Sequence, residues 1–174
     1  MEPKIKRKMS FSSGGFSALL DWIHIAIVAI VIVGIVNGFF LQMILVEQNS
    51  MLPTFESGER VLLNKSAYWF NDVQRGDVVV FYLESADSNY IKRVIGLPGD
   101  TVTIANGDVT VNGEVLVEDY ISESTQGEFS ITVPENKYFV LGDNRNLSVD
   151  SREESFGCIT KESLLGKVII INIK

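Results

Sequence analysis

The sequence of 174 residues holds one histidine, one cysteine and no excess of positive charge. Cys158 has no second cysteine with which to form an internal disulfide, and a single thiol is too few for a cysteine zinc site. The formal net charge of −7 argues against a nucleic-acid partner, because such proteins present a basic surface to phosphate. These shortages exclude a disulfide scaffold, and they leave His24 as the only imidazole available for chemistry.

Charged side chains are also missing between Trp22 and Val46, where His24 is the only acidic or basic residue. About 20 helical residues cross the hydrocarbon core of a membrane, so this run is long enough to span it with some tilt. The run is too long for a secretory signal sequence, and no small-x-small cleavage pattern follows it, which predicts a retained anchor. Within it, Gly34 and Gly38 form a small-xxx-small pair, which indicates either a weak homodimer or a chance match.

The basic residues before this run set the predicted orientation, because positive charge is retained on the cytoplasmic side. We therefore expect a single-pass protein with a cytoplasmic N-terminus. Residues 1–21 would form the cytoplasmic tail, residues 22–46 the transmembrane helix, and residues 47–174 an extracytoplasmic domain. The basic residues are Lys4, Lys6, Arg7 and Lys8.

The segment after Val46 has the short apolar runs and tight turns of a β domain. Two Asn-Gly pairs, at 106–107 and 112–113, suit type I′ hairpin turns because both central residues tolerate positive φ. They predict a three-stranded meander, and other runs rich in β-branched and aromatic residues predict further strands. The predicted fold is therefore mainly β, a compact all-β domain with one N-terminal transmembrane helix. The strands expected cover 78–82, 90–95, 101–104, 108–111, 114–117, 138–141 and 168–171.

Ser50 closely follows the predicted anchor and is a candidate nucleophile. A serine hydroxyl attacks poorly until a base takes its proton, and the usual base is histidine. His24 is predicted to lie across the membrane from Ser50, so this topology excludes a serine–histidine mechanism. A neutral lysine can serve instead, and burial lowers the lysine pKa from about 10.4 by up to ~3–5 units. Lys92 lies in an apolar strand-like run, where it is either such a buried base or an exposed strand lysine.

Four segments, taken in order, resemble the conserved boxes of type I signal peptidases, and the resemblance runs from the anchor to the C-terminus. The single anchor and compact domain are similar to the Gram-positive bacterial branch. The branch that uses histidine in place of Lys92 fits less well. The segments are residues 50–54, 75–79, 92–100 and 142–152.

The resemblance implies a role for each matching residue. Ser50 resembles the nucleophile that attacks the scissile carbonyl, and Lys92 resembles the general base that then protonates the leaving amine. Ser148 resembles the serine that hydrogen-bonds the lysine amine and orients it. Asp150 and Arg152 resemble a structural ion pair behind the site, for which the alternative is a solvated surface pair. Further supporting residues are Arg93 near that pair, the lysine-buttressing loop of Gly142, Asp143 and Asn144, and the serine-turn residues Met51, Pro53 and Thr54.

Gln48 departs from the family pattern at the position two before the nucleophile. That position is commonly a small residue, or a serine that helps to bind the oxyanion. The backbone N–H of Ser50 supplies one oxyanion donor. Gln48 supplies a second through its side-chain amide, or it contributes only backbone while its side chain points to solvent. We favour the second alternative, because the long glutamine side chain would have to be ordered.

The sequence therefore predicts a serine endopeptidase of the bacterial cell membrane that removes N-terminal signal peptides from exported preproteins, with no metal and no cofactor. The resemblance implies small substrate residues one and three positions before the cut. An alternative is a specialised pilus-assembly protein of this family, with a dedicated substrate or a non-catalytic role beside pilus or secretion machinery. A self-cleaving serine–lysine regulator is a third interpretation, but it needs a DNA-binding head where this chain has an anchor.

The lipid bilayer is a further expected partner, because several apolar residues follow the anchor. They form a surface that touches lipid, or they belong to the core of the β domain. These residues are Met51, Leu52, Phe55, Tyr68, Trp69 and Phe70.

Overall fold

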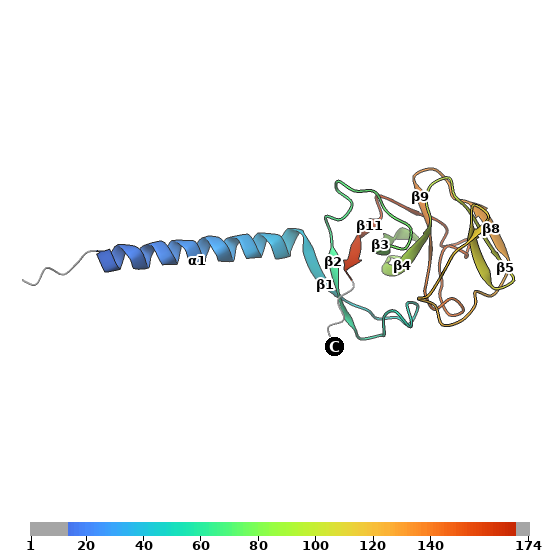
Figure 1. Cartoon of the computed structure of the whole chain (residues 1–174), viewed down its shortest axis with the longest axis horizontal. Helices are drawn as coiled ribbons and strands as arrows, with labels where there is room; N and C mark the ends of the chain where they lie inside the picture. Colours follow the sequence, from blue (N-terminus) through green and yellow to red (C-terminus); the bar gives the residue numbers. More distant parts are fainter. Residues whose placement is uncertain (1–13, 170–174) are drawn as a thin grey trace, which may run out of the picture. The chain divides into compact units, whose positions relative to one another are not determined.

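The computed structural model describes residues 14–169, and its N-terminal element is one long helix, α1 (Gly14–Phe39) (Figure 1). The helix is apolar around its whole circumference, a pattern that is typical of a membrane span or of a helix buried in a large core. Its window Ala18–Val36 is long and apolar enough to cross a membrane, and its large apolar side chains are exposed. The helix therefore has the composition of an anchor.

The bounds of this helix differ from the predicted span of 22–46. The helix begins earlier, at Gly14, and ends at Phe39, and the next apolar residues form strand β1 (Leu41–Leu45). The prediction of a helix up to Val46 was therefore wrong at its C-terminal end. Apolar runs do not by themselves distinguish a helix from a strand, and here β1 satisfies its backbone by pairing with β2 (Arg60–Asn64). The basic residues of the predicted tail, Lys4, Lys6, Arg7 and Lys8, lie outside the described residues.

β1 is an edge strand of a seven-stranded antiparallel sheet with the order β1-β2-β11-β3-β4-β9-β10. Strand β4 (Ser88–Gly96) is the longest, and it pairs with β3 on one side and with β9 on the other. This position makes β4 a well-supported place for a buried functional side chain. The remaining strands of the sheet are β3 (Val78–Leu83), β9 (Lys137–Leu141), β10 (Ile159–Thr160) and β11 (Leu164–Ile169).

A second, four-stranded sheet has the order β7-β6-β5-β8. The predicted meander is present, and Asn106, Gly107, Asn112 and Gly113 all have the positive φ that their turns require. Figure 1 shows β5 and β8 of this sheet at the opposite end of the β domain from β1. The strands are β5 (Thr101–Ala105), β6 (Asp108–Val111), β7 (Glu114–Val115) and β8 (Phe129–Thr132).

The prediction of a mainly β domain is confirmed, although several strands were not predicted. β1, β2, β8 and β10 were missed, because the first was assigned to the helix and the others are short or mostly polar on one face. One short 3-10 helix, η1 (Glu84–Ala86), joins β3 to β4. Residues 170–171 of the last predicted strand lie outside the described residues.

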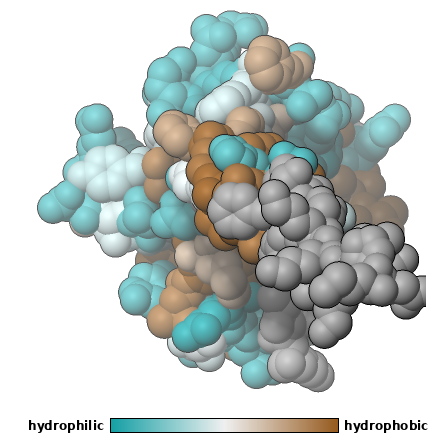
Figure 2. All heavy atoms as spheres, turned by 90° about the vertical axis from the view of Figure 1, so that its left-hand side faces the viewer, coloured by the Kyte–Doolittle hydropathy of each residue, from teal (hydrophilic) through white to brown (hydrophobic). Residues whose placement is uncertain are grey.

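The apolar residues that follow the anchor divide between the core and the surface. Met51 and Phe55 are buried in the core, and Tyr68 and Leu52 are partly buried. Trp69 and Phe70 are exposed, and Phe70 is 93% exposed. Figure 2 is viewed from the side of α1, so the hydrophobic residues near the middle of the view include those of the helix itself, and mostly hydrophilic residues lie around the edge.

Candidate active site

Ser50 opens a tight turn whose far end is fixed in the core. The N–H of Phe55 donates to the carbonyl of Met51 at 3.0 Å, and both of these side chains are buried. Ser50 is itself buried, and its hydroxyl lies where β4 can reach it. Within residues 14–169 the backbone N–H of Ser50 makes no hydrogen bond, so this donor is available to a ligand.

Lys92 lies on the central strand β4, opposite Val79 of β3. Its ammonium group donates a hydrogen bond from Nζ to Oγ of Ser50 at 2.7 Å, and the residue is only 1% exposed. The ring of Tyr90 lies 5.7 Å from Nζ. The structure therefore has the buried lysine of the catalytic interpretation, and the exposed strand lysine was the wrong alternative.

The surroundings of Lys92 favour a neutral amine. Burial lowers the pKa of Lys92 from 10.5 to about 8, although the nearby carboxylates of Asp150 and Asp143 act in the opposite direction. Near this pH a large fraction of the amine carries a free lone pair, and the 2.7 Å contact can then transfer the proton of Ser50 to Nζ. A base with a pKa close to the working pH is well suited to such transfer.

Asn144 holds the backbone of the Ser50 segment in place. Its backbone N–H donates to the carbonyl of Ser50 at 3.0 Å, and its side-chain amide donates to the carbonyl of Asn49 at 3.0 Å. The resemblance implied that this loop supports the lysine. The contacts of Asn144 instead support the backbone of Ser50 and Asn49.

Gly142 and Ser148 pack closely together beside Ser50. A Cβ atom on residue 142 would lie 2.5 Å from the carbonyl oxygen of Ser50 and would collide with the side chain of Ser148. Glycine is therefore required at this point of close approach. The hydroxyl of Ser148 donates to the carbonyl of Val149 at 3.5 Å, and it makes no hydrogen bond to Lys92 in the described part of the chain. The expected orienting contact is replaced by packing against Gly142.

Arg93 and Asp143 form a two-point ion pair next to the candidate dyad. Nε donates to Oδ1 at 2.8 Å and a terminal nitrogen donates to Oδ2 at 2.6 Å, while the Asp143 side chain is fully buried. Thr54 donates to the same carboxylate at 2.5 Å, which ties the serine turn to the pair. Arg93 was expected beside Asp150 and Arg152, but its carboxylate partner is Asp143.

Asp150 and Arg152 form a second ion pair, with Nε 2.8 Å from Oδ1. The carboxylate of Asp150 is buried and also accepts from the backbone N–H of Gly142 at 3.0 Å. Arg152 donates to the carbonyl of Arg145 at 2.6 Å. The solvated surface pair was therefore the wrong alternative, since both groups hold the loop together from inside.

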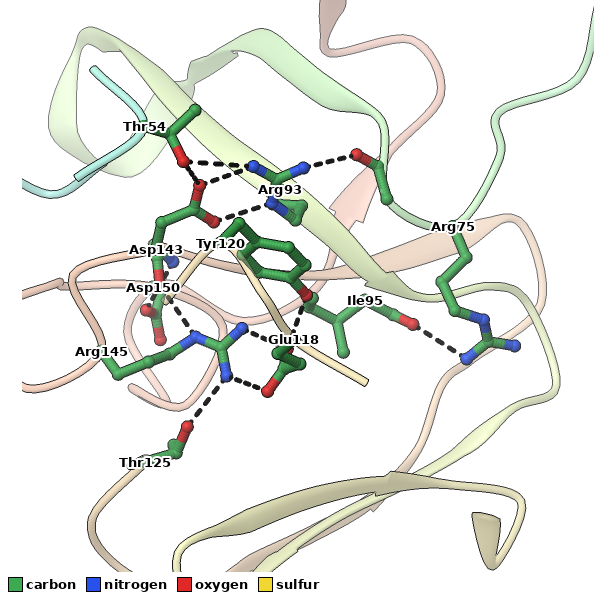
Figure 3. A network of polar contacts seen from close by, with 12 residues as sticks. Thr54, Arg75, Arg93, Ile95, Glu118, Tyr120, Thr125, Asp143, Arg145 and Asp150 are labelled. Atoms are coloured by element: carbon green, nitrogen blue, oxygen red, sulfur yellow. Dashed lines mark hydrogen bonds and ion pairs between the residues drawn. The ribbon is translucent and has the colours of Figure 1, made fainter. Parts of the chain in front are cut away.

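Arg145 is the centre of a buried network that sequence reasoning missed (Figure 3). Its guanidinium is fully buried, pairs with Glu118 and donates to Thr125 and to the carbonyl of Gly142. The ring of Tyr120 lies 3.9 Å from the Arg93 guanidinium, so the segment that carries Glu118 and Tyr120 also covers the ion pair of Arg93 and Asp143. Glu118 and Tyr120 belong to an irregular segment whose sequence carries no signal of the contact, whereas Arg145 lies inside a recognised motif.

Two clefts lie beside the Ser50 segment, and both are lined by Glu47, Gln48 and Tyr90. One, of about 290 Å³, lies between residues 44–48 and residues 88–91, and the other, of about 360 Å³, contains Ser50 with Leu147 and Val149. Gln48 lines both clefts and its side chain is exposed, with no hydrogen bond in the described part of the chain. This position is compatible with either role that the sequence left open for Gln48. Within residues 14–169, no group of three acidic, histidine or cysteine side chains is arranged to hold a metal ion.

A buried serine, a lysine of lowered pKa beside it, and a free backbone N–H next to an open cleft define the class of serine hydrolases that use lysine as base. The family model described as signal peptidase, peptidase S26, matches residues 19–173. The chain therefore belongs to the S26 family of signal peptidases.

Named relatives agree with this assignment. Signal peptidase I P of Bacillus subtilis subsp. natto is 38% identical over 161 residues, which cover 86% of each chain. Signal peptidase IB of Staphylococcus aureus is 38% identical over 169 residues, which cover 86% of this chain and 87% of that protein. The crystal structure of a signal peptidase I from Enterococcus faecalis has a TM-score of 0.50 and 36% identity, and it covers 57% of this chain and 98% of that one. These relatives confirm the expected likeness to the Gram-positive branch.

Proposed function

We propose that Ser50 and Lys92 form the catalytic dyad with which this membrane-anchored signal peptidase cleaves signal peptides from exported preproteins. The observation that carries the proposal is the 2.7 Å contact between a buried lysine amine and a serine hydroxyl. Family membership gives the reaction, a serine endopeptidase acting on signal peptides. The named relatives are signal peptidases, and nothing among them favours a pilus-assembly role.

The reaction follows from the positions of these groups. Neutral Lys92 takes the hydroxyl proton of Ser50 as Oγ bonds to the scissile carbonyl carbon, and the carbonyl oxygen becomes an oxyanion. The backbone N–H of Ser50, which makes no hydrogen bond within residues 14–169, is available to stabilise that charge. The ammonium of Lys92 then returns the proton to the amide nitrogen as the C–N bond breaks. Water repeats the sequence on the acyl-enzyme and releases the signal peptide as an acid.

The cleft between residues 44–48 and 88–91 fits the substrate residues before the cut. Two chain segments border this cleft: one continues from the end of β1, and the other is the first half of β4. An extended peptide could lie between them. Buried Val46 and Val80 and partly buried Ile44 and Ile91 form its floor. An apolar lining around a cleft of this limited volume favours the small side chains that the resemblance implies one and three positions before the cut.

The proposed orientation has the N-terminus in the cytoplasm and the β domain outside, with the bilayer as a partner. The basic residues before the helix support this direction. Exposed Trp69 and Phe70, together with Met43 and Leu45 on β1, offer apolar side chains to a lipid surface. Protease added to intact spheroplasts should digest the β domain and spare an N-terminal tag. Protection of the β domain would show that the orientation is the opposite of the proposed one. The weak homodimer through Gly34 and Gly38 stays a prediction.

The test of the dyad uses the full chain in detergent and a preprotein substrate. Ser50→Ala and Lys92→Ala should each abolish cleavage while the unfolding transition remains cooperative. The double variant should be no worse than either single variant, because groups acting as one unit are strongly non-additive. Lys161→Ala, which changes an exposed lysine, is the control and should leave turnover unchanged. Turnover near wild type by Lys92→Ala would exclude Lys92 as the base.

A further inference from the structure

Two exposed apolar side chains border the cleft that contains Ser50. Leu147 is 78% exposed and Val149 is 56% exposed, and both line this cleft together with Tyr90. Exposed apolar side chains that line a cleft are a common feature of ligand sites. The catalytic steps described above use neither residue.

The backbone that carries these two side chains is held firmly. The N–H of Leu147 donates to the carbonyl of Asn144 at 3.2 Å, and Arg152 donates to the carbonyl of Ser148 at 3.3 Å. Ser148 lies between the pair in the chain, but its side chain packs against Gly142 and does not line the cleft. Leu147 and Val149 are therefore placed at the cleft by a supported loop, so they can contact a bound peptide without a large ordering cost.

The cleft of Leu147 and Val149 continues the groove proposed for the residues before the cut. The two clefts share Glu47, Gln48 and Tyr90, and Ser50 lies in the second of them. A peptide that fills the first cleft and presents its scissile carbonyl to Ser50 must leave the site along the second. The chain leaving in that direction carries the residues that follow the scissile bond.

We propose that Leu147 and Val149 contact the first residues of the mature protein, those that follow the cut, and favour apolar side chains there. The inference rests on the proposed function, since it needs a peptide bound across Ser50. Among the described residues, Glu47 is the only charged one that lines this cleft, so it adds repulsion against an acidic residue in the same place. The pair is thus a specificity determinant for the leaving half of the substrate.

The experiment compares quenched fluorescent peptides that are identical up to the cut and carry Leu-Leu or Ser-Ser directly after it. The wild-type chain should cleave the Leu-Leu peptide with a kcat/KM roughly 3–10-fold higher, the scale expected for partly buried apolar contacts. The double variant Leu147→Ser/Val149→Ser should bring this ratio close to one, with the Ser-Ser peptide within about twofold of wild type. The conservative variant Leu147→Met/Val149→Ile should keep the preference.

Val117→Ser is the matched control, because Val117 is 86% exposed but does not line the cleft. It should leave both kcat/KM values and their ratio unchanged. If the double variant keeps the wild-type ratio of the two kcat/KM values, this inference fails while the proposed function stands. The same holds if the double variant instead changes the selectivity for the residues before the cut. If the wild-type chain cleaves neither these peptides nor a preprotein, the proposed function fails and this inference fails with it.

Discussion

Arg93 and Asp143 face each other through two parallel hydrogen bonds, one residue along β4 from Lys92 and one residue into the loop from Gly142. The pair therefore joins the strand that carries Lys92 to the loop that holds the backbone of Ser50. Its charges are almost completely removed from water, with the Asp143 side chain fully buried. A buried pair of this kind fixes a geometry, and removing one partner leaves the other charge without compensation.

We expect Asp143→Asn to destabilise the β domain by about 3–5 kcal/mol, because it leaves the Arg93 guanidinium buried without its carboxylate. Chemical denaturation of the purified full chain measures the change. Asp72→Asn is a suitable comparison, since Asp72 pairs with Lys161 at 3.6 Å on the surface, and it should cost no more than about 1 kcal/mol. Equal effects of the two substitutions would show that burial of the Arg93 pair contributes nothing.

Cleavage should increase as the pH rises through about 8, where Lys92 loses its proton. Protonated Lys92 has no lone pair for the hydroxyl of Ser50, so the rate should fall about tenfold for each pH unit well below this value. Single-turnover rates on a peptide substrate between pH 6 and pH 9.5 measure the profile. A maximum near pH 5 with a decline towards alkaline pH would contradict a lysine base.

Lys92→Met should make the domain more stable than the wild type at neutral pH. The folded-state pKa of Lys92 is lowered, so the unfolded chain binds more protons and wild-type stability rises with pH between about 8 and 10.5. The advantage of the variant, up to about 3 kcal/mol, should therefore be complete below pH 8 and shrink towards pH 10.5. Comparing the free energies of unfolding at each pH cancels the titration of the tyrosines and Cys158. A difference in unfolding free energy between variant and wild type that stays constant with pH would mean that folding does not change the pKa of Lys92.

Gln48→Ala should change turnover by less than about threefold, because the exposed side chain of Gln48 makes no hydrogen bond within residues 14–169 that would order it towards Ser50. Steady-state kinetics on a preprotein substrate provides the measurement, with thermal unfolding to check the fold. Loss of a true oxyanion donor costs roughly 10²–10³ in turnover. A hundredfold decrease without a change in unfolding would assign the second oxyanion donor to the Gln48 amide.

The sequence was sufficient where one residue type permits one conformation or one chemistry. The Asn-Gly turns fixed the meander, and the lack of a histidine near Ser50 directed attention to Lys92, which the structure places within hydrogen-bonding distance. The end of the helix was not predictable in this way. Leu41–Leu45 is as apolar as the helix before it, and only its pairing with β2 makes it a strand.

Contacts between distant segments were the other limit of the sequence. Nothing in the order of residues indicates that Glu118 pairs with Arg145, because the contact depends on how the irregular segment after β7 returns to the loop. The same applies to Arg93, which was expected near Asp150 but meets Asp143. Motifs identify the residues that matter, whereas the packing of the two sheets and their loops determines which of them meet.

Folding creates the proposed catalytic pair of Ser50 and Lys92. In an unfolded chain Lys92 is an ordinary lysine, almost entirely protonated at neutral pH, and Ser50 is an ordinary serine. Only when β4 is enclosed by β3 and β9 does burial lower the pKa of the amine to about 8. The polypeptide therefore lacks its proposed proton acceptor while it is being synthesised and inserted.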